Sequence, residues 1–123
     1  MAGDALSIAA SGMSAQSRRL RHVAENMANA DTPGFRAKRV AFEADGAGGV
    51  RPGGVTLDAR PLPRVHDPAH PMAGTDGFYE GSNVDLVMEI ADSREAQRSY
   101  EANLRMFDQV RQMRTALIDL LRR

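Results

Sequence analysis

The sequence contains no cysteine and no tryptophan, and it has only two tyrosines and four phenylalanines. Without cysteine the chain forms no disulfide, no thiolate metal site and no thiol nucleophile. Its apolar side chains are mainly those of Ala, Leu, Val and Met, which suit contacts between helices better than a thick globular core. At 123 residues the chain has the length of one domain.

Net charge and long apolar runs are also lacking. Sixteen basic and sixteen acidic residues balance, so the overall charge favours neither nucleic acid nor an anionic membrane. No stretch approaches the roughly 20 apolar residues that a membrane-spanning helix needs. The first ten residues lack the basic region and apolar run of a cleavable secretory signal. The expected location is therefore the cytoplasm, unless a route without a cleaved signal exports the chain.

Residues that break helices are confined to the middle of the chain. All six prolines lie between Pro33 and Pro71, and nine of the eleven glycines lie between Gly34 and Gly81. The sequence predicts an N-terminal helix in residues 1–32, a Gly/Pro-rich β and loop region in 33–82, and a C-terminal helix in 83–123. The predicted fold class is mainly α, with the two long helices paired as a coiled-coil-like bundle and a small irregular β-hairpin region between them.

Apolar side chains in the first segment recur at alternating spacings of three and four residues, which is typical of a heptad seam. Gln16 is a polar member of the seam, and Gly12 weakens the helix by about 1 kcal/mol relative to Ala. A partner helix is therefore expected to stabilise it. The residues predicted to form an assembly interface on this helix are Leu6, Met13, Leu20, Val23 and Met27.

A turn is predicted directly after this helix. Pro33 and Gly34 stand in the order favoured at the two central positions of a type II turn, and Asp31 lies just before them. Asn26 and Asn29 stand three residues apart at the end of the helix, where their amides can bond free backbone groups. A generic helix end explains one such Asn well and two less well, so the pair is predicted to fix the turn.

The middle region predicts only weak β structure. Residues 36–43 are compatible with a short strand, because Val40 and Phe42 share one face. Residues 44–54 contain five glycines, and too few side chains to offset the entropy of ordering, so they are expected to form a mobile tip. Phe78 and Tyr79 lie between two glycines and are expected to belong to the same small hairpin region.

The C-terminal helix is expected to begin near Asn83 or Asp85, either of which can cap it. At about 1.5 Å per residue it would be about 60 Å long, far more than the middle segment can cover. Its apolar stripe is close to a 3.6-residue period. The stripe begins at Leu86, Ile90 and Ala96, and its predicted assembly-interface residues are Tyr100, Leu104, Phe107, Val110, Met113, Leu117 and Leu121.

His66, Asp67 and His70 form the only constellation that resembles a metal site. Pro68 and Pro71 exclude the helical turn that would bring the two imidazoles together, and no third ligand has a recognisable spacing. A loop that binds no metal is therefore favoured.

Arg18, Arg19 and Arg21 form a small basic cluster of the kind that can contact phosphates. Glu25 is nearby and no aromatic residue is interleaved, so a solvated or ion-paired face is favoured. His22 and the serines of this helix lack the positioned Asp of a hydrolase. The sequence therefore predicts no catalytic residue, no metal and no cofactor.

The segment from Ala24 to Phe35, with its ordered Asn, Asp, Pro and Gly residues, resembles the N-terminal signature of bacterial flagellar rod and hook proteins. Residues 11–16 and 37–42 extend the resemblance. Residues 65–71, Asn83 to Asp85 and residues 99–103 are similar to the proximal-rod members of this family. Two departures are a glycine-rich tip and Gly81-Ser82, where a proline more usually precedes the Asn-Val-Asp run.

The resemblance implies a structural subunit of a rod in the flagellar basal body, which spans the periplasm and transmits torque. It implies delivery through the flagellar type III export system without a cleaved signal. The implied partners are other rod proteins of the FlgB, FlgF and FlgG type, the rod-base protein FliE, and copies of the chain itself in a helical assembly. It implies no nucleic acid and no direct membrane insertion.

Two hypotheses from different classes follow. In the first, the helices pair within a subunit and pack against neighbours, and the ends are partly disordered before assembly. In the second, the chain is a cytoplasmic helical adaptor or regulator that binds partners through its amphipathic helices. A metal-dependent enzyme is a distant third.

Overall fold

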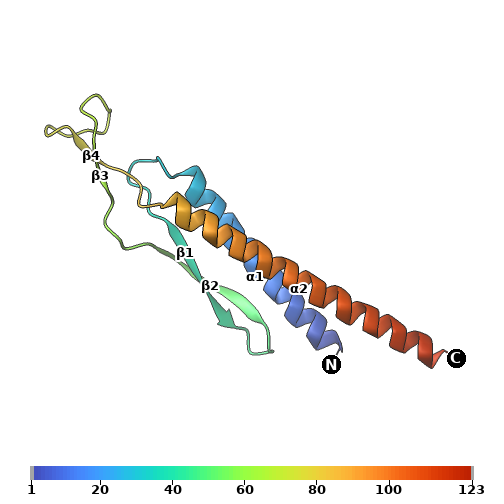
Figure 1. Ribbon diagram of the computed structural model, residues 1–123. Coiled ribbons are helices and arrows are strands. Elements are labelled where there is room, and N and C mark those ends of the chain that lie inside the picture. The colour runs from blue at the N-terminus through green and yellow to red at the C-terminus, as the bar shows by residue number, and fades with distance from the viewer. Residues whose placement is uncertain (1, 123) are drawn as a thin grey trace.

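The computed structural model describes residues 2–122 and confirms the predicted fold class. Two long helices lie side by side, and a small region of antiparallel strands joins them (Figure 1). The elements in chain order are α1 (Ala2–Ala28), β1 (Lys38–Ala44), β2 (Val50–Leu57), β3 (Arg64–His66), β4 (Phe78–Glu80) and α2 (Leu86–Leu121).

The two helices run antiparallel, so both ends of the chain lie at the same end of the molecule (Figure 1). α1 has 27 residues and α2 has 36. At 1.5 Å per residue these correspond to about 40 and about 54 Å. The last turns of α2 therefore extend past the beginning of α1.

Local chemistry explains where the helices meet the β region. Asp85 is the N-cap of α2, and its carboxylate accepts a hydrogen bond of 3.0 Å from the amide of Val87. After α1, the amide of Phe35 donates to the carbonyl of Thr32 at 3.2 Å, and Gly34 has a φ of +76°. A positive φ at this position is what a type II turn requires, so the predicted turn is confirmed.

β1 and β2 form a hairpin with Lys38 opposite Leu57 and Ala44 opposite Val50, and its register shifts between Val40 and Phe42. The prediction that residues 44–54 form a tip without fixed conformation is wrong, since residues 50–54 belong to β2 and residues 45–49 alone form the turn. Strand pairing uses backbone groups, so it does not need the side chains that these glycines lack.

The turn of this hairpin is built from Asp45 and the glycines that follow it. The Asp45 carboxylate accepts hydrogen bonds from the amides of Ala47 and Gly49 at 2.8 and 3.0 Å. Gly46 and Gly48 have φ values of +83° and +86°, which a residue with a side chain rarely adopts. Glycine thus permits this turn rather than preventing order.

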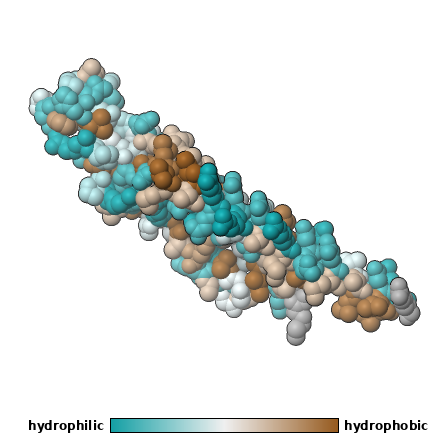
Figure 2. Space-filling view, viewed as in Figure 1, coloured by the Kyte–Doolittle hydropathy of each residue, from teal (hydrophilic) through white to brown (hydrophobic). Residues whose placement is uncertain are grey.

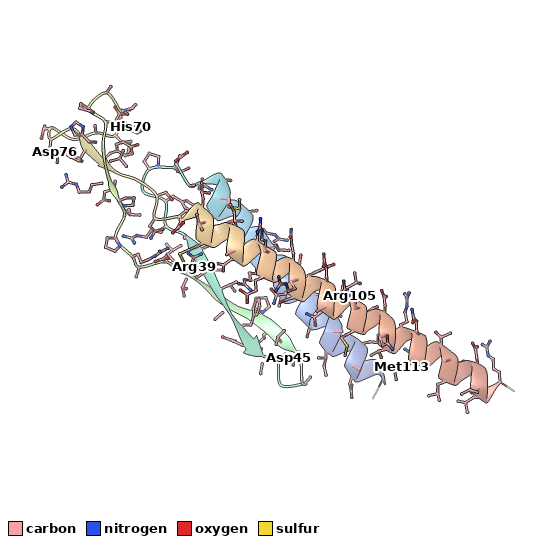
Figure 3. All side chains as sticks on the ribbon, in the orientation of Figure 1. Arg39, Asp45, His70, Asp76, Arg105 and Met113 are labelled. Atoms are coloured by element: carbon pink, nitrogen blue, oxygen red, sulfur yellow. The ribbon has the colours of Figure 1, made fainter. Side chains whose placement is uncertain are left out.

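The second pair of strands is much shorter. β3 and β4 pair antiparallel, with His66 opposite Phe78 and Val65 opposite Tyr79. They lie at the end of the molecule opposite the chain ends, and the loop between them contains His70 and Asp76 (Figure 3). The predicted small hairpin region therefore consists of two separate two-stranded sheets.

The buried core is thin and partly polar. Its buried apolar residues are Ala9, Ala15, Val23, Ala37 and Ala96. The small side chains of Ala9 and Ala15 on α1 and of Ala96 on α2 allow the two helices to approach closely. Among the described residues, the largest fully buried side chains are polar ones, and they belong to Asn26 and Glu89. The centre of the fold is therefore fixed by hydrogen bonds as much as by apolar packing.

Candidate functional site

The predicted interface residues on α1 mostly face the rest of the same chain. Val23 is buried, and Leu6, Met13 and Leu20 are half-buried. Met27 is 37% exposed. The seam of α1 is thus largely covered by α2 and the hairpin.

The predicted interface residues on α2 become more exposed toward the C-terminus. Phe107 and Val110 are half-buried, as is Tyr100, and Leu104 is 39% exposed. Met113, Leu117 and Leu121 are 62%, 60% and 80% exposed. Every residue from 111 to 121 is exposed, so the overhang of α2, defined as residues 111–121, presents apolar side chains to solvent.

A second exposed apolar patch was absent from the predicted interface. It lies at the start of α2, where Figure 2 shows a broad hydrophobic area. Val87 is 76% exposed, and Leu86, Met88 and Ile90 are between 41% and 47% exposed. Four large apolar residues within five positions cover more of the circumference of a helix than one seam does. This excess of apolar residues is the pattern in the sequence that could have indicated the patch.

A polar junction joins α1, β1 and α2. The side-chain amide of Asn26 donates to the Lys38 carbonyl at 3.0 Å and to Glu89 Oε2 at 3.3 Å, and Asn26 Oδ1 accepts from the Lys38 amide at 2.8 Å. Glu89 Oε1 accepts from Arg39 Nη1 at 2.7 Å. Arg39 lies between the hairpin and the start of α2 (Figure 3). The amide and the carboxylate are fully buried, and each has partners.

The junction continues into the segment after β2. Asp58 forms ion pairs with Arg60 at 2.8 Å and Arg39 at 3.4 Å. The hydrogen bond from the Arg60 side chain is the main reason that the pKa of Asp58 is lowered to about 2. Asn83 connects this segment to the turn, because its Oδ1 accepts from the Ala37 amide at 2.7 Å and its Nδ2 donates to the Asp58 and Arg60 carbonyls at 3.1 Å.

A second group of contacts lies near the N-terminal end of α1. The Ser11 hydroxyl accepts a hydrogen bond of 3.1 Å from the amide of Val50, which attaches the hairpin to α1. Gly12 is buried beneath Asn103, and a Cβ at residue 12 would lie 2.7 Å from the Asn103 amide. Gly12 therefore permits the close approach of α2, which sequence reasoning interpreted only as a weakness of the helix.

Asn29, Asp31 and Pro33 are the remaining predicted residues at the turn, and the hydrogen bonds of Asn29 stay within this segment. The Asn29 side chain donates to the Glu25 carbonyl at 2.8 Å and accepts from the Thr32 hydroxyl at 3.0 Å. Pro33 is half-buried and Asp31 is exposed. The two asparagines that the sequence pairs thus act differently, since Asn29 bonds within the helix end and Asn26 bonds across to β1 and α2.

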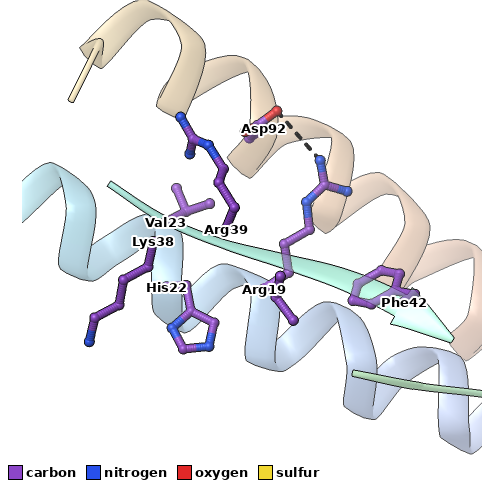
Figure 4. Close-up of a pocket in the computed structure, with 8 residues that line it drawn as sticks. Arg19, His22, Val23, Lys38, Arg39, Phe42 and Asp92 are labelled. Atoms are coloured by element: carbon purple, nitrogen blue, oxygen red, sulfur yellow. Dashed lines mark hydrogen bonds and ion pairs between the residues drawn. The ribbon is translucent and has the colours of Figure 1, made fainter. Parts of the chain in front are cut away.

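A hollow of about 260 Å³ lies between α1, β1 and α2 (Figure 4). Its cations are paired: Arg19 with Asp92 at 3.5 Å, Lys38 with Glu25 at 2.7 Å, and Arg39 with Glu89. The His22 ring nitrogens have no hydrogen-bond partner within the described part of the chain. Because these cations already have acidic partners, we assign no ligand to the hollow.

The two histidines of the middle region are held by aromatic contacts. The His66 ring lies 4.7 Å from that of Phe78 in a T-shaped arrangement, and the His70 ring stacks on Tyr79 at 4.0 Å. In residues 2–122 no group of three potential metal-ligating side chains occurs. Within the same residues, no helix is long and apolar enough to cross a membrane.

Comparison with known proteins gives matches at both helices. A family model for flagella basal body rod protein matches residues 6–36, and one for the C-terminal part of flagellar basal body rod FlgEFG proteins matches residues 75–120. Both matched segments contribute residues to the polar junction, because the first contains Asn26 and the second contains Asn83 and Glu89.

Curated relatives extend the similarity over almost the whole chain. The flagellar basal-body rod protein FlgC of Agrobacterium fabrum is 43% identical over 127 residues, covering 94% of this chain and 91% of that protein. FlgC of Salmonella typhimurium is 38% identical, and FlgC of Escherichia coli O157:H7 is 37% identical, each covering 86% of this chain and 87% of the relative. The chain is therefore a structural flagellar basal-body rod protein and belongs to the FlgC family.

Proposed function

We propose that this chain is a subunit of the proximal rod, and that it assembles by packing the exposed apolar faces of α2 against neighbouring rod subunits. The proposed neighbours are rod proteins of the FlgB, FlgF and FlgG type, the rod-base protein FliE and further copies of the chain. In such an assembly the helices transmit torque along the rod. The comparisons give no support to a cytoplasmic adaptor.

The observation that carries the proposal is the amount of exposed apolar helix. The chain exposes 8481 Å² of surface. A compact protein of 13.4 kDa exposes about 6,500 Å². The difference, about 2,000 Å², is more than twice the roughly 800 Å² that each partner buries in a specific interface. The overhang supplies part of this surface through Met113, Leu117 and Leu121.

The proposed location is the periplasmic part of the basal body, reached through the flagellar type III export system without a cleaved signal. The absence of cysteine is compatible with export of an unfolded chain into an oxidising compartment. The thin, alanine-rich core is compatible with it too, because a small buried apolar area stabilises a fold only modestly.

The test uses cells that lack their own copy of this protein. Leu117→Glu combined with Leu121→Glu places two charges in the exposed apolar overhang. We expect the variant to fold as the parent does by circular dichroism but to be absent from purified basal bodies and to leave the cells non-motile. Gln112→Glu, an exposed substitution on the same helix, is the matched control and is expected to be incorporated.

Normal motility of the doubly substituted cells would contradict packing through the overhang. Cell fractionation tests the location separately. Parent protein that stays in the cytoplasm of cells with intact flagellar export would contradict the rod assignment and favour the adaptor.

A further inference from the structure

Two pairs of facing residues, here called couples, lie in the contact between α1 and α2 and share one register of the two helices. Asn26 lies against Glu89, and Gly12 lies beneath Asn103. The residue numbers of each couple sum to 115, as expected when two antiparallel helices face each other in a single register. On each helix the couples are two heptads apart, so they occupy the same row of the contact.

The apolar seam by itself defines this register poorly. A heptad seam presents a similar surface every seven residues, so a shift by one heptad preserves most apolar contacts. α2 has 36 residues and α1 has 27, which leaves room for such a shift. The overhang would receive α1, because Met113, Leu117 and Leu121 are exposed there.

The two couples make the shifted register unfavourable. After a shift of one heptad toward the C-terminus of α2, Asn26 would face Ala96 and Glu89 would face a position beyond the end of α1. The buried amide and carboxylate would lose each other, and burial of polar groups without partners is costly. Gly12 would then face Val110, and Asn103 would lose the space that the missing side chain of Gly12 leaves for it.

We propose that the Asn26–Glu89 couple, assisted by the Gly12–Asn103 couple, selects the register in which α1 pairs with α2. The couple discriminates against shifted pairing of the two helices within one chain. A polar residue in a helix seam is known to fix register at a cost in stability. Asn26 also bonds both backbone groups of Lys38, so the chosen register includes the first residue of β1.

The absence of cysteine allows the register to be measured by disulfide formation. Ala5 and Val110 are both half-buried and occupy the next heptad step of the same row. Ala5→Cys with Val110→Cys therefore reports the native register, and Ala5→Cys with Leu117→Cys reports the register shifted by one heptad. Each pair is placed in the full chain with and without Asn26→Leu plus Glu89→Leu, a change that leaves Arg39 its contact with Asp58.

With Asn26 and Glu89 present, we expect mild oxidation to close the native pair within one chain and to leave the shifted pair reduced. With both replaced by Leu, we expect the yield of the shifted disulfide to rise by about tenfold, since one lost buried polar partner is worth about that factor. Helicity by circular dichroism is expected to be retained.

Two matched variants distinguish an effect on the choice of register from an effect on the stability of the chain. Gln16→Leu removes a polar seam residue whose buried Oε1 has no partner within residues 2–122, and it is expected to keep the single native register. Glu89→Gln keeps an acceptor for Asn26 and is also expected to keep the single native register. The proposal is overturned if chains that carry Asn26→Leu and Glu89→Leu close only the native Cys pair, or if they lose their helicity, because the couple would then serve stability alone.

Discussion

Asn103 and Gly12 illustrate how one side chain can depend on the absence of another. The Asn103 amide donates to the Ser99 carbonyl at 2.9 Å and lies over Gly12 of the facing helix. A methyl group at residue 12 would press on the Asn103 amide, which is already held by that hydrogen bond. The benefit that alanine normally brings to a helix is therefore opposed here by a contact with the other helix.

The first prediction concerns this couple. In an exposed helix, Gly→Ala stabilises by about 1 kcal/mol. We expect Gly12→Ala to give none of this gain in the parent chain, but to give it when Asn103→Ala has already removed the facing amide. Urea denaturation of the four members of the cycle measures the coupling. Equal effects of Gly12→Ala in both backgrounds would show that Asn103 does not constrain residue 12.

The second prediction concerns pH. The pKa of Asp58 is lowered from 3.8 to about 2, chiefly by the Arg60 side chain. A lowered folded-state pKa contributes stability that is complete above pH 3.8 and is lost as the pH falls through about 2. We expect the free energy of unfolding of Asp58→Asn to fall less between pH 4 and pH 2 than that of the parent chain.

Chemical denaturation across this pH range measures the effect. Glu101→Gln, which changes an exposed carboxylate on α2, is the control and should leave the acid dependence unchanged. Parallel loss of stability in the parent and in Asp58→Asn would contradict a stabilising role of the Asp58 carboxylate.

At the scale of elements, the turn end of the β1–β2 hairpin is attached to α1 by few contacts. The Ser11 hydroxyl accepts from the Val50 amide, and it donates to the Ile8 carbonyl at 2.7 Å. Gly48 and Gly49 lie close to Ile8 and Ser11, so the turn of the hairpin contacts about one turn of the helix. The position of this turn along α1 therefore depends on few side chains.

The third prediction tests this attachment. Ser11→Ala removes the acceptor for the Val50 amide, a change worth about 1 kcal/mol. We expect faster amide hydrogen exchange at residues 45–50, with exchange in the centre of α1 unchanged. Ser14→Ala, an exposed serine on the same helix, is the control. Unchanged exchange at Val50 in the Ser11→Ala variant would mean that backbone pairing alone positions the hairpin.

The elements differ in how well the sequence predicts them. Both helices follow from local patterns, since proline and glycine are confined to the middle and Asp85 stands where a cap is needed. The end of α1 follows from Pro33 and Gly34. A small hairpin region between the helices was predicted, but the order of its glycine-rich turn was not, because that order comes from backbone pairing and from Ser11, which is 39 residues away from Val50.

The polar junction was the least predictable part of the candidate site. Asn26 and Glu89 are 63 residues apart, and a single sequence contains no pattern that pairs them. Sequence reasoning therefore assigned Asn26 to the turn and did not connect it with Glu89. The exposed start of α2 was missed for another reason, because a search for one apolar stripe passes over Val87 and Met88, which lie beside it.

At the scale of the whole molecule, the balance between buried and exposed apolar surface governs behaviour in solution. Among the residues whose burial the structure describes, the core has five buried apolar residues, four of them alanine, while large apolar side chains are exposed at both ends of α2. A chain of this kind leaves large apolar side chains that neighbours could bury. We therefore expect its stability to depend on its concentration and on its partners.

The fourth prediction follows from this balance. We expect the isolated chain in dilute solution to be partly disordered at its ends, with fast amide exchange in residues 111–121. We expect its helicity by circular dichroism to rise with concentration as the overhang finds partners. Full helicity in dilute solution, together with a melting temperature independent of concentration, would contradict coupling between folding and assembly.

The antiparallel arrangement of α1 and α2 also decides where the molecule tolerates a label. Both chain ends lie beside the overhang, so a fluorescent protein or affinity tag fused to either of them would crowd the surface proposed for assembly (Figure 1). The loop between β3 and β4 lies at the opposite end, and its residues 74–76 are exposed. A short epitope inserted there would report on the subunit from the end farthest from its termini.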